Sequence, residues 1–487
     1  MRFRTITRRR VVASAEPIPL NNLRSGTVAA LALATLTSAI VLLPLWAAAA
    51  VLVTLLCLPL AWWAFARGGR WLSLFFFATL LLPPLPISLG DTGPHPAILV
   101  AGVGLLAGIV RFDQWRWRWR APDAAMLALT LALAISLGFA AVYSGVAIAA
   151  TSTARVALFG IGVYVYFAAA RGPESRQETS RITHSLFWIA AAAALFGCVD
   201  FLYQLPAPAG FEPQFLWLES GVYRRAQGLF YESSTLGNFC AFFLLFVAVS
   251  LTGHRNRRLV PASALAVGGV IFASALLLSF SRASVFACLI SLAVLAWIER
   301  ERWFSRRSMI GIAGLSCAAI AIFAAAVPEV AEGYWGRLQQ AFDTIQDSPD
   351  RALSGRLESW STVFGFALEH PLQTLFGIGY KTLPYTQYLG RPVIADNMYL
   401  SLLVETGAFG LAALLALNVT ILITSWRAMR IGSLYGKWLF CFWIGESLQM
   451  LSGDILTYWR VLPLYFWVLA QAVRATEGEA RHAGSAD

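Results

Sequence analysis

Uninterrupted apolar runs recur along almost the whole chain, and most of them approach twenty residues in length. A run of that length matches the helix that crosses the hydrocarbon core of a bilayer. Apolar residues make up 58% of the 487 residues and charged residues only 13%, against roughly 25% charged residues in soluble domains. The sequence therefore predicts an all-α polytopic membrane protein, and it excludes a soluble enzyme, a secreted domain and a disordered chain.

Fourteen apolar segments are candidate spans, although Pro44 alone separates the first two and the fourth is short. We therefore expect about 12–14 transmembrane helices. The segments cover residues 27–43, 45–66, 71–89, 97–110, 124–142, 154–170, 185–203, 235–252, 260–280, 283–298, 308–327, 397–424, 438–452 and 461–474.

The basic residues divide unevenly between the two sides of this arrangement. With the N-terminus in the cytosol and alternating spans, the cytosolic segments hold 27 of the 37 Lys and Arg residues and the outer segments hold ten. Cytosolic loops of membrane proteins carry such an excess, so we expect both termini in the cytosol. The net charge of +11 then reflects topology, and it does not indicate nucleic-acid binding.

Two segments between spans are long enough to hold a polar site, and this topology puts both on the outer side. The larger is 328–396, and the other is 204–234. The predicted organisation is a basic cytosolic tail (1–26), a transmembrane bundle with its outer loop (27–327), the large periplasmic loop (328–396), C-terminal transmembrane helices (397–474) and a cytosolic tail (475–487).

Five arginines on the predicted outer side could form an anion clamp. They are Arg155, Arg224, Arg225, Arg282 and Arg356. Guanidinium groups match phosphate oxygens in a bidentate geometry, so a membrane-embedded diphosphate is the natural ligand for such a group. Each arginine also has an ordinary explanation, such as a snorkelling residue in a tight turn for Arg282, and only their convergence would indicate a site.

Acidic groups at the end of the large loop are candidates for chemistry. Asp396 and Asn397 precede an apolar segment, where Asp396 is either a helix cap or a general base that activates a hydroxyl. Glu405 lies two turns further on, and an acid at that depth indicates function by default. Glu232, Asp200 and Asp454 are weaker candidates.

The motifs of several enzyme classes are missing from the sequence. It has no phosphate-binding glycine loop, no His-Glu-x-x-His, no Asp-x-Asp and no Cys-x-x-Cys, and its five histidines are scattered. We therefore expect no metal site and no cofactor. An ATP-driven pump and a glycosyltransferase that uses a soluble nucleotide sugar are both disfavoured.

Four short segments, taken in order, resemble the O-antigen ligase / O-antigen polymerase superfamily of bacterial inner-membrane proteins. They are 228–237 (GLFYESSTLG), Ser281-Arg282, 355–360 (GRLESW), and 370–380 (HPLQTLFGIGY) with 396–410 (DNMYLSLLVETGAFG). The resemblance covers most of the chain and is strongest from about 220 to 410.

The resemblance implies a GT-C-like membrane architecture and metal-independent glycosyl transfer at the periplasmic face of the inner membrane. The donor would be a glycan on undecaprenyl diphosphate, and the acceptor a glycan or lipid A–core. It implies that Arg282, Arg356 and one of Arg224 and Arg225 hold the diphosphate, and that a base in the large loop activates the acceptor. The sequence departs from many ligases, which have His-Asn where this chain has Asp396-Asn397.

That departure leaves three functions open. A polymerase of O-antigen or exopolysaccharide repeat units fits at least as well as a ligase that transfers glycan to lipid A–core. A transporter of lipid-linked sugars or another anion is the alternative outside the enzymes. A transporter favours broken helices, charges near mid-membrane and repeated halves, whereas the charges here fall at the predicted outer ends and no repeat is evident.

Overall fold

The structure is a computed structural model that describes residues 68–85, 94–173, 175–206, 211–218, 221–252, 259–303, 328, 331–336, 339, 356–385 and 392–483. The spans predicted at 27–43, 45–66 and 308–327 lie outside these residues.

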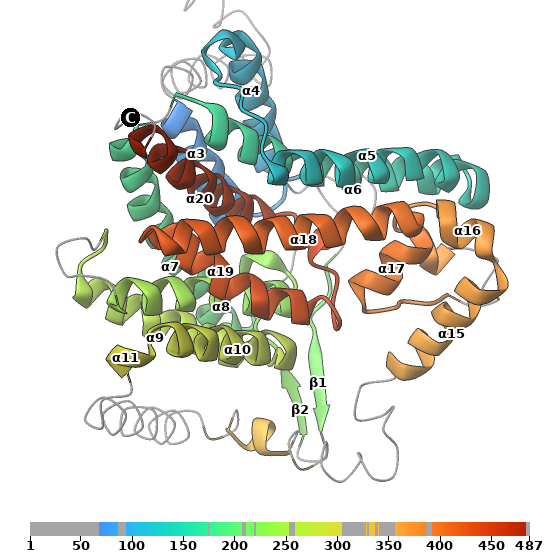
Figure 1. Cartoon of the computed structure of the whole chain (residues 1–487). Helices are drawn as coiled ribbons and strands as arrows, with labels where there is room; N and C mark the ends of the chain where they lie inside the picture. The colour runs from blue at the N-terminus through green and yellow to red at the C-terminus, as the bar shows by residue number, and fades with distance from the viewer. Residues whose placement is uncertain are drawn as a thin grey trace, which may run out of the picture. The chain divides into compact units, whose positions relative to one another are not determined.

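The described chain is almost entirely helical (Figure 1). The first five helices described are α3 (Gly68–Leu81), α4 (Pro96–Val110), α5 (Ala121–Ser144), α6 (Val146–Arg171) and α7 (Arg176–Tyr203). The next four are α8 (Ser233–Thr252), α9 (Ala262–Leu278), α10 (Arg282–Ile298) and α11 (Arg300–Trp303). The last six are α15 (Arg356–Glu369), α16 (Pro371–Phe376), α17 (Met398–Glu405), α18 (Gly407–Arg430), α19 (Leu434–Gln449) and α20 (Leu462–Ala483).

Five of the described helices, α5, α6, α7, α8 and α18, are long and apolar enough to cross a membrane, and α3, α4, α9 and α10 are shorter apolar helices. The only sheet among the described residues is the two-stranded ribbon of β1 (Phe215–Leu218) and β2 (Gly221–Arg224). Single turns of 3-10 helix are η1 (Phe112–Gln114), η2 (Gly228–Phe230), η4 (Leu383–Tyr385) and η6 (Ile455–Thr457). The prediction of an all-α polytopic membrane protein is confirmed.

Local capping signals explain why some helices extend beyond the apolar runs. α7 begins nine residues before its predicted span because Ser175 and Glu178 form a capping box, in which each side chain accepts the backbone N–H of the other residue. α10 begins at Arg282 because the hydroxyl of Ser281 accepts the N–H of Ser284. Polar residues thus set these helix starts, and hydropathy alone does not locate them.

The centre of the bundle lies where α8, α19 and α20 meet, and α18 packs along α5 and α19 (Figure 1). On α8, Phe242 packs its ring against those of Trp438 and Tyr465, with ring centroids 4.2 and 4.7 Å away. Aromatic pairs at this spacing add favourable energy beyond the burial of their apolar area. These contacts join chain segments about 200 residues apart and hold the C-terminal helices against the middle of the chain.

The prediction of one continuous helix over 397–424 is wrong, because the chain breaks into α17 and α18 at Thr406. Gly407 adopts φ +76°, and a Cβ there would lie 2.3 Å from the carbonyl oxygen of Leu375. The last carbonyls of α17 accept N–H groups from the preceding loop, from Ile378 at 3.0 Å and from Gly379 at 2.8 Å. The loop after α16 therefore occupies the space that a continuous helix would need.

The segment 204–234 is held against the bundle through the residues that follow its ribbon. β1 and β2 pair antiparallel, with Phe215 opposite Arg224. Beyond β2, the N–H of Ala226 donates to the carbonyl of Leu278 at the end of α9, at 2.9 Å. The buried guanidinium of Arg460 donates to the carbonyl of Leu229 in η2. These bonds bring the residues after β2 beside the turn between α9 and α10.

Candidate functional site

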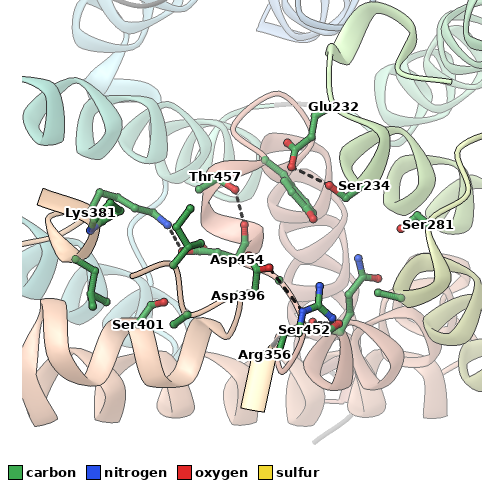
Figure 2. Close-up of a pocket in the computed structure, with 18 of the residues that line it drawn as sticks. Glu232, Ser234, Ser281, Arg356, Lys381, Asp396, Ser401, Ser452, Asp454 and Thr457 are labelled. Carbon is green, nitrogen blue, oxygen red and sulfur yellow. Dashed lines mark hydrogen bonds and ion pairs between the residues drawn. The ribbon is translucent and has the colours of Figure 1, made fainter. Parts of the chain in front are cut away.

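A cavity of about 480 Å³ lies where the ends of several helices meet residues of the two long segments between predicted spans, 204–234 and 328–396 (Figure 2). Its walls come from α6, the segment after β2, the start of α8, the α9–α10 turn, the start of α15, η4, the residues before α17, α17 itself and the connection from α19 to α20. The volume falls within the range of small-molecule sites, about 300–1,000 Å³.

Most of the residues singled out from the sequence line this one cavity. They are Arg155, Arg225, Arg282, Arg356, Glu232, Asp396, Glu405 and Asp454. Arg224, Asp200 and Asn397 are not among its described lining residues. The fold thus brings residues that are up to about 300 positions apart in the sequence to one cavity. Their positions in the sequence alone do not predict this.

Three of the arginines form the cationic side of the cavity, which we call the arginine lobe: Arg225, Arg282 and Arg356. The side chain of Arg225 donates through Nε to the carbonyl of Ser279 at 3.0 Å, which ties it to the α9–α10 turn that carries Arg282. Arg282 in turn interacts electrostatically with Arg356. Like charges held together in this way favour an anion between them.

Burial lowers the pKa of the Arg225 guanidinium from its usual value, and the neighbouring positive charge of Arg282 acts in the same direction, although Glu232 opposes both. The charged form of Arg225 is therefore less stable here than in water. A bound anion would offset that cost, so the electrostatics of the arginine lobe fit an anionic ligand.

Four helices begin at the cavity, which adds to its positive potential. Ser234 is the second residue of α8, Arg282 the first of α10 and Arg356 the first of α15, and Asp396 lies just before α17. The N-terminus of a helix carries about half a unit of positive charge and unpaired N–H groups. Anion binding at the cavity therefore has backbone support as well as arginines.

Asp396 lies at the edge of the cavity, and its side chain is 53% exposed. Its Oδ2 is 3.6 Å from Nε of Arg356, a loose ion pair that Figure 2 marks with a dashed line. The helix cap, one of the two alternatives for Asp396, is supplied by Asn397, whose side-chain oxygen accepts the N–H groups of Tyr399 and Leu400 at 3.0 and 3.1 Å. Capping therefore explains Asn397 and leaves the carboxylate of Asp396 facing the cavity.

The backbone around Asp396 is fixed by two hydrogen bonds. The indole N–H of Trp360 in α15 donates to the carbonyl of Ala395 at 2.7 Å. The N–H of Met398 donates to the carbonyl of Met450 at the end of α19, at 2.8 Å. Asp396 is thus held between two helices that both contribute to the cavity.

A second charged group in the cavity contains a residue that the sequence reasoning missed, Lys381. Its ammonium donates to the carboxylate of Asp454, and the carboxylate of Glu405 and the guanidinium of Arg155 interact with it electrostatically. We call these four residues the lysine lobe. Lys381 follows the Gly377–Tyr380 motif directly, and that position in the large loop is the signal that could have found it.

Burial lowers the pKa of the Lys381 ammonium, but the carboxylates of Asp454 and Glu405 and the hydrogen bond to Asp454 together outweigh it, so the pKa lies above its usual value. Lys381 therefore keeps its charge at neutral pH, and its contact with Asp454 is an ion pair.

Three residues that line the cavity have left-handed backbone conformations although none is glycine. Phe280, Lys381 and Asp396 have φ of +50°, +59° and +43°. Such a conformation costs about 1–2 kcal/mol for a residue with a Cβ, and it persists only where the surrounding structure imposes it. The fold therefore holds two of the charged side chains of the cavity at positions that the backbone alone would not choose.

Asp200 and Arg224 form a buried ion pair with each other, with 3.1 Å between Oδ1 and Nη2. The other oxygen of Asp200 accepts the N–H groups of Gln227 and Gly228 at 3.3 and 3.0 Å. Arg224 also donates to the carbonyl of Leu205 at 2.8 Å. The pair thus shapes the turn that leads from β2 past Arg225, and its partners account for both side chains.

Arg224→Met is expected to lower the free energy of unfolding by about 3–5 kcal/mol, because it leaves the carboxylate of Asp200 buried without its cation. Thermal unfolding of the purified protein in detergent measures this effect. Arg430→Met is the matched control, since Arg430 is exposed near the end of α18 and its loss should change stability by less than about 0.5 kcal/mol. Equal unfolding temperatures for Arg224→Met and the wild type would contradict the structural role of the pair.

Among the residues that the structure describes, no group of three or more His, Cys, Asp or Glu side chains is arranged to hold a metal ion. His370, beside the Gly-rich motif, packs its ring against Phe366 at 4.7 Å and is not a described lining residue of the cavity. The polar chemistry of the cavity therefore comes from its carboxylates, guanidinium groups, ammonium group and hydroxyls.

A family model described as O-antigen ligase matches residues 267–415. The match extends from α9 into α18 and contains Arg282, Arg356, Lys381, Asp396 and Glu405 of the cavity. A comparison with curated proteins gave no match. The match supports the resemblance of the chain to the O-antigen ligase / O-antigen polymerase superfamily, and three of its four motif segments, all except 228–237, lie within the matched residues.

Proposed function

We propose that this protein is a periplasm-facing polymerase of undecaprenyl-diphosphate-linked O-antigen or exopolysaccharide repeat units in the bacterial inner membrane. The observation that carries the proposal is the shared cavity, in which Arg225, Arg282 and Arg356 lie together with a carboxylate, Asp396. The three arginines carry the positive charge that a diphosphate needs, and the carboxylate of Asp396 can accept a proton.

In the proposed reaction, the carboxylate of Asp396 takes the proton of an acceptor hydroxyl as that oxygen attacks the anomeric carbon of the donor sugar. The bond from this carbon to the lipid diphosphate breaks, and its electron pair leaves with the diphosphate. Arg225, Arg282 and Arg356 stabilise the charge that develops there, and stabilisation of this kind usually contributes more to the rate than any other single effect. The lipid diphosphate supplies the bond energy, so the transfer requires no nucleotide.

The proposed orientation follows from the distribution of basic residues, with both termini in the cytosol and the cavity open to the periplasm. Four helices begin at the cavity, and all four beginnings belong to the side assigned as outer. The same side contains the lining residues from 204–234 and 328–396. A donor with its lipid tail in the bilayer would then present its diphosphate at the depth of Arg282.

The second candidate is an O-antigen ligase that transfers the lipid-linked glycan to lipid A–core, and the description of the matching family favours it. The residue pair Asp396-Asn397 favours the polymerase, because many ligases of the superfamily have His-Asn there. Both reactions share the donor, the leaving group and the need for a base. They differ in the acceptor, so product analysis separates them.

Deletion of the gene followed by gel analysis of the surface glycan tests the proposal. A polymerase predicts that the ladder of long chains disappears and a single-repeat product remains, and that the wild-type gene restores the ladder. Bare core with accumulated lipid-linked polymer would instead identify a ligase. An unchanged ladder together with an unchanged lipid-linked pool would reject both enzymes and a transporter of lipid-linked sugars, and it would leave only a transporter of another anion.

A further inference from the structure

The charges that line the cavity divide into two groups by their interactions. Arg225 interacts with Glu232 and Arg282, and Arg282 with Arg356. Lys381 interacts with Asp454, Glu405 and Arg155. In Figure 2, the ion pair of Lys381 with Asp454 and that of Arg356 with Asp396 are separate contacts that face the same cavity.

The two lobes differ in charge balance. The lysine lobe has two cations, Arg155 and Lys381, against two carboxylates, Asp454 and Glu405, and its lysine is already paired. A balanced set of donors and acceptors does not favour a dianion. It does suit a neutral ligand with many hydroxyl groups, each of which donates one hydrogen bond and accepts others.

Glu405 supplies the observation that indicates a ligand. Its side chain is only 2% exposed and lines the cavity. Its Oε1 accepts the N–H of Leu383 at a long 3.4 Å, whereas its Oε2 has no hydrogen-bond partner within the described part of the chain. A buried acceptor in that state carries a desolvation cost, and a ligand hydroxyl that reaches this carboxyl group from the cavity would lower that cost.

The lysine lobe is also fixed in place before any ligand binds. The loop that carries Lys381 donates two backbone hydrogen bonds to the end of α17, which carries Glu405. A Cβ on Gly377 would lie 2.5 Å from the carbonyl oxygen of Glu405, so only glycine allows this close approach. Lys381 itself is held at φ +59°. Such pre-organisation lowers the entropy cost of binding.

We propose that the lysine lobe, through Lys381, Asp454 and Glu405, binds the hydroxyl groups of the acceptor saccharide, beside the diphosphate in the arginine lobe. The inference rests on the proposed function for the identity of the acceptor, and it adds the residues that select it. Asp396 lines the same cavity as both lobes and pairs with Arg356, so the proposal places an acceptor in the lysine lobe with one hydroxyl directed to the carboxylate that activates it.

Two separate binding titrations on the purified full chain in lipid nanodiscs test this inference. One probe is undecaprenyl diphosphate without sugar, and the other is the oligosaccharide released by mild acid from the lipid-linked pool of the native cells. Lys381→Gly and Glu405→Gln are expected to weaken oligosaccharide binding about tenfold or more, because each removes a hydrogen-bonding group from a charged set. Binding of undecaprenyl diphosphate should stay within about twofold of the wild type, since neither variant alters the arginine lobe.

The variants are chosen so that a folding defect cannot imitate the result. Lys381→Gly removes the side chain and relieves the left-handed backbone, and Glu405→Gln keeps the shape of the side chain. Lys381→Arg keeps the charge and should restore most of the binding. Gln204→Gly is the matched control, because Gln204 also has a left-handed backbone, φ +48°, but is exposed at the end of α7 and does not line the cavity.

The outcomes separate this inference from the proposed function. Unchanged oligosaccharide binding in both variants, or an equal loss for both probes, would overturn the acceptor site. A wild-type protein that binds the oligosaccharide but not undecaprenyl diphosphate would instead overturn the proposed donor and leave the saccharide site standing. In a transfer assay, the acceptor site predicts a rise in KM for the acceptor that exceeds the fall in kcat.

Discussion

Arg282→Ala is expected to lower glycan transfer by at least about 100-fold, which is the usual loss when one donor to a developing negative charge is removed. Arg282 is the first residue of α10, and it lies between Arg225 and Arg356 in their chain of electrostatic contacts. Its loss would remove from the proposed diphosphate site the guanidinium that lies between the other two. The measurement is the initial rate of transfer from lipid-linked donor in membranes that contain equal amounts of each variant.

Three further variants show whether the effect belongs to the site. Arg282→Lys should recover only part of the rate, since an ammonium keeps the charge but loses the bidentate geometry. Arg356→Ala should also abolish product, because Arg356 contributes to the arginine lobe and contacts Asp396. Arg430→Ala, an exposed arginine near the end of α18, is the control and should leave the rate unchanged. A near-normal rate for Arg282→Ala would remove the anion clamp from the mechanism.

The membrane character of the fold could be predicted from the sequence because hydropathy is a local property. Each apolar run indicates a helix whatever the rest of the chain does. The break at Thr406 could not be predicted in that way. It depends on the loop around Ile378 and Gly379, which donates to the last carbonyls of α17, and local propensity carries no information about a partner more than twenty residues away.

That several of the predicted arginines would lie together could be predicted from the sequence, but not which of them. A cluster of outer arginines indicated an anion site, yet adjacent residues have different fates: Arg225 lines the cavity, whereas Arg224 pairs with Asp200. Arg224 is the last residue of β2 and Arg225 the first after it, so the place where the ribbon ends decides which of the two side chains faces the cavity. The sequence alone does not show where that end lies.

Lys381 was missed for a related reason. In the sequence it is one isolated cation in a long loop, and neither Asp454 nor Glu405 is near it along the chain. Only the approach of the loop to α17 and to the connection before η6 makes the three residues a group. The left-handed backbone of Lys381 also cannot be predicted from the composition of the loop, although this conformation helps to direct the side chain into the cavity.

Asp396→Asn is expected to lower kcat by about 10²–10⁴-fold, the range that general base catalysis contributes, with little change in KM for the donor. Asparagine has the same shape as aspartate and adopts a left-handed backbone at least as readily, so φ +43° at this position is no obstacle to folding. The variant therefore removes the ability to accept a proton and preserves the local structure. Steady-state transfer rates at saturating donor and acceptor give kcat, and titration with undecaprenyl diphosphate shows that binding survives.

Two comparisons sharpen the test. Asp113→Asn makes the same chemical change at an exposed position in η1 and should have no effect. Asn397→Ala removes the cap of α17 and should cost about 1 kcal/mol of stability. Its effect on kcat should be much smaller, because within the described part of the chain the side chain of Asn397 bonds only to the backbone of its own helix. Turnover by Asp396→Asn at the wild-type rate would remove Asp396 as the base. Asp454 and Glu232 would then be the remaining carboxylates of the cavity to test for that role, since Glu405 is assigned to the acceptor.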